Sequence, residues 1–302
     1  MDIAIHRFKE NPLIVPRPDI YWMTECAFNP GVIGDAKGKF HMLIRGNDKR
    51  GTQEKSTLGY ASSEDGIHWS IAPQPVIKCA MPHIAKGIED PRIVWWKGSY
   101  YIFATACHQH YGRIGIWKTQ DFLSLEWVGS PFDWDGKAAC IVPELIGGKV
   151  YLLHMMYPNL GLGETSDVSL AGGWANKRII LRASDIIIDG QPPVFVELAS
   201  SPVKYNNDWL VLFHAIFEPY EHRVSFMILD GVDLSLKYLH NKSILRPELY
   251  CEKYGWVCHV CFLTGIVDMG DRWYVYWGGA DTVILGGYLL KEEIHKGIGG
   301  LK

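Results

Sequence analysis

The feature that most constrains the fold is a pattern that recurs five times along the 302 residues. Each copy begins with a turn containing Gly, Asn or Asp and continues as a strand rich in aromatic residues. The copies are GKFHMLIRG from residue 38, GSYYIFATAC from 98, GKVYLLHMM from 148, NDWLVLFHA from 207 and DRWYVYWGG from 271. Their starts lie 60, 50, 59 and 64 residues apart, so each copy marks one unit of a repeat architecture.

Short strands surround each copy of the pattern. A short apolar strand precedes it, often near a proline: FNPGVIG, EDPRIVWW, VPELIG, SPVKY and VCFLTGIVDM. Strands bounded by turn residues, with no convincing helix, predict an all-β protein. Five units of about four strands each at this spacing predict a five-bladed β-propeller. A double sandwich is the alternative, but it would not explain five equal turn-and-strand signals.

We expect residues 1–302 to form one domain, a single five-bladed β-propeller with catalytic function. The N-terminal segment should pair with the last blade, because this closure removes an exposed sheet edge. The innermost strand of each blade lines the central axis of a propeller. The active site is therefore expected at that axis, where polar side chains from different blades converge.

Composition excludes several other classes of function. The net charge of -3, without a long basic run, gives no electrostatic footprint for nucleic acid. No window reaches the roughly 20 apolar residues of a membrane span, and the N-terminus lacks a signal-peptide pattern, so we expect a cytoplasmic protein. Seven scattered cysteines fit reduced thiols, and CHVC at 258–261 has no second pair at zinc-site spacing. No metal or organic cofactor is implied.

Polar residues interrupt the apolar pattern at equivalent places in different units. They are Asn29, Asp90 and Arg92 before or within the first strands, and Arg45, His154, His214 and Asp281 at the ends of the repeated strands. Each alone has a structural explanation: a turn with its own ion pair, a satisfied core histidine or a turn cap. Their recurrence at one repeat position favours convergence on a site, because structural caps need not share such a position.

The residue types at this predicted mouth suit carbohydrate chemistry. Burial among apolar and aromatic residues should raise the pKa of Asp90 and suit it to general acid catalysis. Aromatic faces pack against sugar rings, while Asp, Asn and Arg bind sugar hydroxyls. Glycosidases normally use two carboxyl groups, and only one acid is clearly placed here. A nucleophile other than water would explain a missing second acid.

Six strings resemble the motifs of glycoside hydrolase family 130, in the same order and over nearly the whole chain. They are FNPG, EDPR, VPELIGGKVYLLH, SPVKYNNDWLVLFH, YCEKYGWVCHVCFLTG and VYWGGADTVILGGY. Members of that family are five-bladed propellers that act on β-mannosides as inverting phosphorylases or hydrolases. The resemblance implies that Asp90 is the general acid and passes its proton through a mannose hydroxyl to the glycosidic oxygen. Glu89 is then structural.

The resemblance also assigns binding residues. It implies that Asn29, Arg45 and Asp281 hold the mannosyl ring whose bond is broken. At the phosphate site, Leu145 and Met155 stand where family phosphorylases have Lys and Arg. The remaining candidates for a phosphate or anion site are Lys137, Lys204, His222 and Arg223. Because Met cannot replace a bidentate Arg on phosphate, the first expectation is an inverting β-mannosidase that cleaves β-1,2- or β-1,4-mannosyl bonds.

Hydrolysis needs a base that activates water on the ring face opposite the acid. By resemblance, Glu252 and Glu197 are the first candidates, although either could be a loop acid. The alternative is a β-mannoside phosphorylase that uses inorganic phosphate as co-substrate and releases α-mannose 1-phosphate. Lys137, Lys204, His222 and the expected cytoplasmic location favour it. A second alternative is a non-catalytic glycan-binding propeller, which would not need these converging charged groups. The linkage, the acceptor sugar and the oligomeric state stay open.

Overall fold

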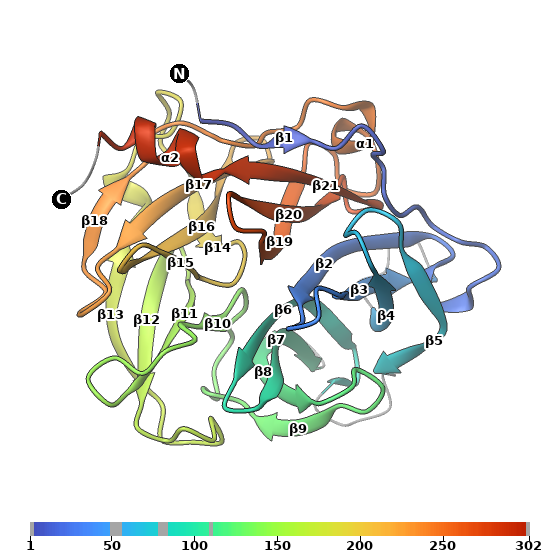
Figure 1. Ribbon diagram of the computed structural model, residues 1–302, viewed down its shortest axis with the longest axis horizontal. Helices are drawn as coiled ribbons and strands as arrows, with labels where there is room; N and C mark the ends of the chain where they lie inside the picture. Colours follow the sequence, from blue (N-terminus) through green and yellow to red (C-terminus); the bar gives the residue numbers. More distant parts are fainter. Residues whose placement is uncertain (1–2, 49–55, 78–83, 109–110, 300–302) are drawn as a thin grey trace.

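Five antiparallel sheets surround a common centre in the computed structural model, which describes residues 3–48, 56–77, 84–108 and 111–299 (Figure 1). Blade one consists of β2 (Cys26–Gly34), β3 (Phe40–Asn47), β4 (Thr57–Ser63) and β5 (Ser70–Ile77). Blade two consists of β6 (Gly87–Trp96), β7 (Ser99–His108), β8 (Tyr111–Thr119) and β9 (Glu126–Gly129). Blade three consists of β10 (Cys140–Ile141), β11 (Val150–Met156), β12 (Asn159–Thr165) and β13 (Ala175–Leu181).

The last two blades follow the same plan. Blade four consists of β14 (Phe195–Leu198), β16 (Asp208–Phe217), β17 (Glu221–Leu229) and β18 (Leu236–Leu239), and β15 (Val203–Tyr205) also pairs with β16. Blade five consists of β19 (Cys261–Asp268), β20 (Arg272–Gly279), β21 (Val283–Leu290) and, from the other end of the chain, β1 (His6–Arg7). In each blade the first strand lies nearest the centre (Figure 1).

The predicted five-bladed propeller is confirmed. Each repeated stretch forms the second strand of a blade: β3, β7, β11, β16 and β20. The predicted first strands were wrong in blades three and four. VPELIG forms a bend and, at Ile146, an isolated bridge to Lys149. SPVKY forms only the accessory strand β15, while the innermost strand β14 carries a buried Glu197 that broke the apolar pattern.

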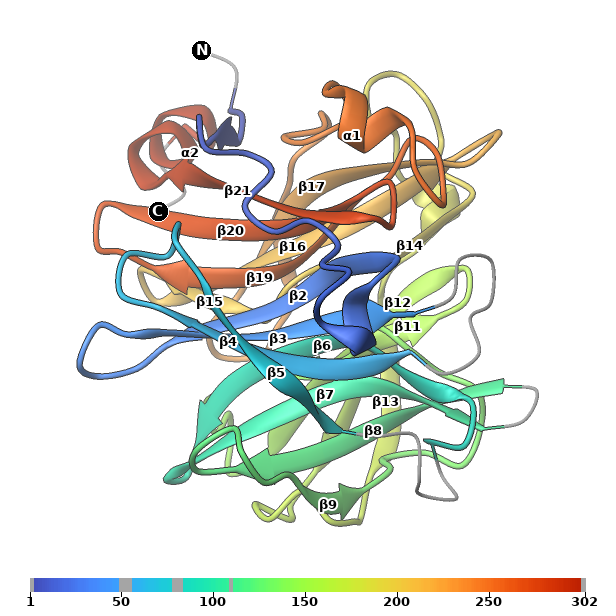
Figure 2. The same ribbon diagram turned by 90° about the vertical axis from the view of Figure 1, so that its right-hand side faces the viewer.

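Helices are few and short. Among the described residues they are α1 (Tyr250–Lys253) and α2 (Lys291–Gly297), both labelled in Figure 2, and the 3-10 helices η1 (Tyr21–Met23) and η3 (Ala183–Asp185). The sequence pattern gave no sign of α2, whose acids in the first turn and bases in the last turn suit the helix dipole. Within the described residues, none of these helices has the length and apolar character needed to cross a membrane.

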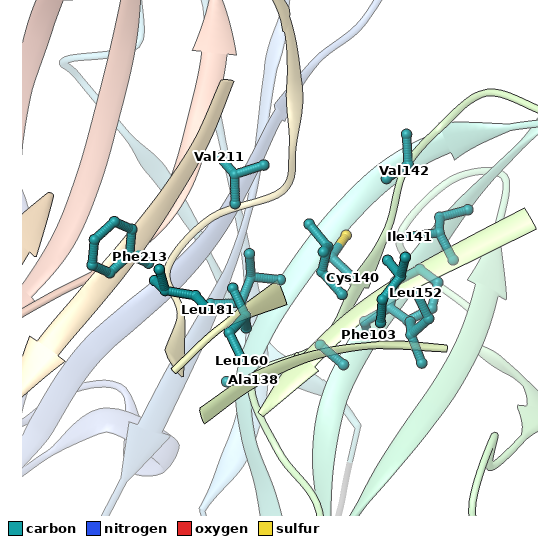
Figure 3. Close-up of a cluster of buried hydrophobic side chains, with 14 of the residues drawn as sticks. Phe103, Ala138, Cys140, Ile141, Val142, Leu152, Leu160, Leu181, Val211 and Phe213 are labelled. Carbon is teal, nitrogen blue, oxygen red and sulfur yellow. The ribbon is translucent and has the colours of Figure 1, made fainter. Parts of the chain in front are cut away.

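The hydrophobic core lies between blades rather than at the axis. Apolar side chains on facing sheets form clusters at the junctions of neighbouring blades. Figure 3 shows part of the cluster shared by blades two, three and four, with Phe103, Leu152 and Phe213 among its members. Each blade buries its faces against two neighbours. The order of the blades therefore determines which innermost strands lie next to each other around the axis.

The N-terminal strand closes the ring, as expected. β1 pairs with β21 along the outer edge of blade five (Figure 1). Arg7 then donates hydrogen bonds of 3.0 and 2.9 Å to the two carboxylate oxygens of Glu252, which is fully buried. Glu252 also accepts hydrogen bonds from the indole N–H of Trp277 and from two backbone N–H groups. One carboxylate therefore joins the first strand, blade five and the segment that contains α1.

Arg7→Ala should lower the stability of the protein, because it leaves the buried Glu252 carboxylate without its cation. We expect the free energy of unfolding, measured by urea titration, to fall by about 3 kcal/mol. Arg17→Ala is the matched control on the same N-terminal segment, since Arg17 pairs with an exposed Asp19. It should leave the transition unchanged, and equal effects of the two substitutions would contradict this role for Arg7.

Candidate active site

Two innermost strands carry the same backbone irregularity at the axis. Asn29 in β2 and Asp90 in β6 have φ angles of 46° and 55°, and each strand shifts its pairing register at that point. Each residue precedes a proline, Pro30 or Pro91, and a proline disfavours helical backbone angles in the residue before it. Asn and Asp tolerate the left-handed region better than most residues, and such strain is typical of functional sites.

The two irregular positions bring Asn29 and Asp90 into direct contact. The Asn29 amide donates a 2.8 Å hydrogen bond to Oδ1 of Asp90, and Arg45 Nη1 donates one of 2.9 Å to the same oxygen. Arg45 Nη2 also donates a 2.7 Å bond to Glu89 Oε1. Asp90 is only 5% exposed. Both hydrogen bonds to Asp90 go to Oδ1 rather than to Oδ2.

The expected rise in the pKa of Asp90 was wrong. Burial does raise it, but the charge of Arg45 and the hydrogen bond from Asn29 outweigh burial and lower the pKa below its usual value. The neighbouring Glu89, assigned only a structural role from the sequence, has a raised pKa because burial and the charge of Asp90 outweigh the attraction of Arg45. The site thus holds two adjacent acids whose environments separate their proton affinities.

Asp281 adds a third carboxyl group from blade five. It lies in the turn after β20, with a φ angle of 51°. Burial raises its pKa to about 7 against the opposing charge of Arg45, and the negative charges of Asp90 and Glu89 contribute to the rise. The partly buried Asp281 therefore changes its charge near neutral pH.

Asn29 fits only because residue 278 has no side chain. A Cβ atom on Gly278 would overlap Oδ1 of Asn29 and lie 2.8 Å from its backbone nitrogen. Oδ1 is buried and has no hydrogen-bond partner among the described residues. Such an acceptor is costly to leave unpaired, so it is a natural position for a sugar hydroxyl to donate to.

A second group of ionisable residues lies in the same electrostatic environment. Lys137 Nζ lies 3.0 Å from Oε2 of Glu197, whose side chain is fully buried. His214 Nδ1 lies 3.8 Å from the other Glu197 oxygen, and its Nε2 accepts a 2.9 Å hydrogen bond from the backbone N–H of Leu263. Burial and neighbouring cations hold the pKa of His214 well below its usual value, so the ring is neutral with its proton on Nδ1, facing Glu197.

His222 completes this group from strand β17. It is 4% exposed, and neither ring nitrogen has a hydrogen-bond partner among the described residues. Burial and the charge of Lys137 lower its pKa to about 3, while Asp90 acts in the opposite direction. The charges of Lys137 and Asp90 each influence the pKa of the other, and both influence the pKa of Asp281, so the two groups lie within electrostatic reach of each other.

The structure brings most of the predicted residues together. Those in the two groups are Asn29, Arg45, Asp90, Lys137, Glu197, His214, His222 and Asp281. The exposed Tyr220 was missed, although its ring lies 5.0 Å from that of His222. It belongs to the hairpin between β16 and β17 rather than to a repeated strand, so the repeat gave no signal for it.

Arg92 does not face a ligand. Its guanidinium is fully buried and donates hydrogen bonds of 2.6, 2.6 and 2.9 Å to the backbone carbonyls of Ala199, Leu198 and Asp90. The prediction that Arg92 binds substrate is corrected for this reason. Arg92 instead joins the backbone of the Asp90 strand to the segment that follows Glu197.

His154 and Glu252 are also directed elsewhere. His154 bonds to Asn176 of the same blade at 3.0 Å and packs on Phe132 in the connection before blade three. Glu252 is occupied by Arg7 and Trp277 in the closure network described above. The structure therefore argues against His154 as a substrate ligand and against Glu252 as the catalytic base.

Two predicted anion ligands lie outside the site. Lys204 is paired with Glu144 at 2.7 Å and lies opposite Trp209, at the start of β16, whereas His214 lies towards its end. Arg223 is adjacent to His222 on β17 and therefore points to the opposite face of the sheet, where it binds Glu221 and Asp189. Both predictions are corrected.

Among the described residues, no cluster of three or more His, Cys, Asp or Glu side chains is arranged to hold a metal ion. In the CHVC string, Cys258 is exposed while Cys261 is buried. Cys79 lies outside the described residues.

The fold and the site define a propeller enzyme with buried acids and bases gathered at its axis. A sequence model of glycoside hydrolase family 130, described as β-1,4-mannooligosaccharide phosphorylase, matches residues 17–297. The chain belongs to this family.

Relatives extend over almost the whole chain. A 1,2-β-oligomannan phosphorylase of Thermoanaerobacter sp. is 32% identical, covering 93% of this chain and 96% of the relative. A β-1,2-mannobiose phosphorylase of the same organism is 30% identical, covering 95% and 98%. The solved β-1,2-mannobiose phosphorylase of Listeria innocua, in complex with β-1,2-mannobiose, shares the fold with a TM-score of 0.83 at 24% identity, covering 97% and 98%.

Gly278→Ala should impair catalysis without unfolding the protein. The added methyl group displaces Asn29 and breaks its hydrogen bond to Asp90, so we expect kcat/KM to fall by about 100-fold, as for other small misplacements of catalytic groups. Gly172→Ala is the control, since a methyl group there meets nothing within 4 Å. If Gly278→Ala keeps full activity, the contact between Gly278 and Asn29 does not position the site.

Asp281 should make stability depend on pH. The folded protein retains the Asp281 proton up to a pH of about 7, whereas the unfolded chain loses it near 4. The free energy of unfolding contributed by this residue therefore falls as the pH rises between these values. Asp281→Asn should gain stability relative to wild type over that range in urea titrations, while the exposed Asp133→Asn should not. A constant difference for Asp281→Asn would contradict the raised pKa.

Proposed function

We propose that the protein is an inverting β-mannoside phosphorylase, with its five blades acting as one catalytic domain. The observation that carries this proposal is that the charges of Asp90 and Lys137 both act on His222, whose buried ring nitrogens have no partner among the described residues. Both relatives above, which are at least 30% identical over nearly the full chain, are named as phosphorylases. This support for the phosphorylase reverses the order of preference given by the sequence, where Met155 favoured hydrolysis.

Asp90 is the proposed proton donor. Asn29 and Arg45 both bind Oδ1 and lower the pKa of Asp90. When a mannosyl ring takes over the hydrogen bonds of Asn29 and Arg45, these two residues no longer stabilise the charged carboxylate of Asp90. The pKa of Asp90 then rises, so Asp90 can carry the proton that it donates. The proton then moves from Asp90 through a mannose hydroxyl to the glycosidic oxygen as the bond from that oxygen to C1 breaks.

The second group is the proposed phosphate site. A phosphate oxygen attacks C1 from the opposite face and forms α-mannose 1-phosphate. The Lys137 ammonium would exchange its partner Glu197 for phosphate, and His222 has nitrogens free of partners among the described residues. Met155 has an uncharged side chain and packs against the apolar cluster between the blades, so it takes no part in binding phosphate. Phosphate is the only co-substrate proposed, with no metal or organic cofactor.

Hydrolysis is the second candidate function, and Glu197 is the observation that favours it. Its carboxylate is fully buried, lies within 3.8 Å of His214 and pairs with Lys137. A carboxylate in this position is suited to activate water in an inverting hydrolase. Phosphorolysis and hydrolysis thus differ in whether Lys137 is paired with phosphate or with Glu197 during the reaction.

We propose β-mannooligosaccharides as substrates, with β-1,2 linkages first because both relatives carry this linkage in their names. β-1,4 linkages come next, since the description of the matching family contains them. A cytoplasmic location is proposed as well, because a sugar phosphate keeps most of the bond energy in a form that is useful inside a cell.

The decisive experiment is incubation with β-1,2- and β-1,4-mannobiose, with and without inorganic phosphate. Mannose 1-phosphate should form only with phosphate, and Asp90→Asn should lower kcat by about 100-fold to 10,000-fold. Asp19→Asn, on an exposed residue, is the matched control. Free mannose released without phosphate would overturn the phosphorylase, and its loss in Glu197→Gln would establish the hydrolase. Sugar binding without turnover would indicate a glycan-binding module.

A further inference from the structure

Four exposed aromatic side chains border the site, and the reaction proposed above uses none of them. We call Tyr220, Tyr250, Tyr254 and His259 the aromatic rim. Tyr250 is 77% exposed and Tyr254 is 54% exposed, although burial of such rings is normally favourable. Their ring centroids lie 4.9 Å apart, and the Tyr254 ring lies 6.3 Å from that of His259.

The aromatic rim is continuous with the site. The backbone N–H of His222 donates a 3.1 Å hydrogen bond to the carbonyl oxygen of His259, so the segment after α1 lies against blade four. On the same side, the His222 ring contacts Tyr220 at 5.0 Å. Tyr220 and the backbone of His259 therefore both lie against His222, which is 4% exposed. The ring contacts of His259 with Tyr254 and of Tyr254 with Tyr250 continue from there to a ring that is 77% exposed.

The segment that carries Tyr250 and Tyr254 is firmly held. Helix α1 contains Glu252, whose carboxylate is bound by Arg7 and Trp277. Further along the segment, Trp256 packs edge-on against Phe28 at 5.9 Å, and Phe28 lies beneath the Arg45 guanidinium. Exposed rings on a rigid support lose little entropy when a ligand packs on them.

We propose that the aromatic rim binds the sugar units of the leaving group beyond the bond that is cleaved. This inference rests on the proposed function. The buried residues Asn29, Arg45 and Asp90 suit the terminal mannosyl unit, so the rest of an oligosaccharide must extend towards solvent. Exposed aromatic faces next to that path provide the apolar surface on which pyranose rings pack. The preferred substrate is therefore longer than a disaccharide.

The test compares β-mannosides of two, three and four units as substrates for the wild type and for the double variant Tyr250→Ala/Tyr254→Ala. In the wild type, kcat/KM should rise with chain length. In the double variant, the advantage of the tetrasaccharide over the disaccharide should fall by about tenfold. Tyr250→Phe/Tyr254→Phe keeps the ring faces and should keep the advantage. Trp95→Ala is the control, since Trp95 is 51% exposed at the far end of β6.

Other outcomes would overturn this inference. An unchanged length profile in the double alanine variant would remove the aromatic rim from substrate binding. A change in its association state by light scattering, with the length profile intact, would make the surface a contact between copies of this chain. Because each rate counts bond cleavage with either phosphate or water, the choice of nucleophile does not affect the comparison. Failure of the wild type to cleave any β-mannoside would instead contradict the proposed function, and with it this inference.

Discussion

The structure depends most on the hydrogen bonds that the buried carboxylate of Glu252 accepts. It receives Arg7 from the strand that closes the ring, Trp277 from blade five and the backbone at the start of α1. A propeller buries its apolar surface only between neighbouring blades, so an open ring would expose two complete sheet faces. The same carboxylate also holds the segment that borders the site. Closure of the fold and the shape of the site therefore share one anchor.

The site itself depends on backbone that few residues tolerate. Asn29 and Asp90 occupy matching left-handed positions in β2 and β6, and this is what turns both side chains towards each other. Burying several carboxyl groups together would be unfavourable without the guanidinium of Arg45 between Glu89 and Asp90. The resulting arrangement keeps one acid charged and raises the pKa of the others, which is a starting point for proton transfer rather than for structural stability.

The sequence predicted the fold well because the second strand of each blade carries a strong local signal of turn and aromatic residues. It failed at β14, where Glu197 interrupts a four-residue strand, and at β10, which has only two residues. Among site residues, Asn29, Arg45 and Asp90 were found because they share repeat positions. Arg92, Arg223 and Lys204 were assigned wrongly, because a charged residue in a string does not reveal which partner or which face of the strand it will have.

The Arg92 guanidinium links the carbonyl of Asp90 to the carbonyls of Leu198 and Ala199, directly after Glu197. The strand of Asp90, the proposed proton donor, and the strand of Glu197 are thus joined through a single planar group. A redesign of this scaffold for a bulkier or smaller attacking molecule is therefore expected to succeed by exchanging the side chains between these two strands, because moving the strands apart would break the hydrogen bonds of Arg92.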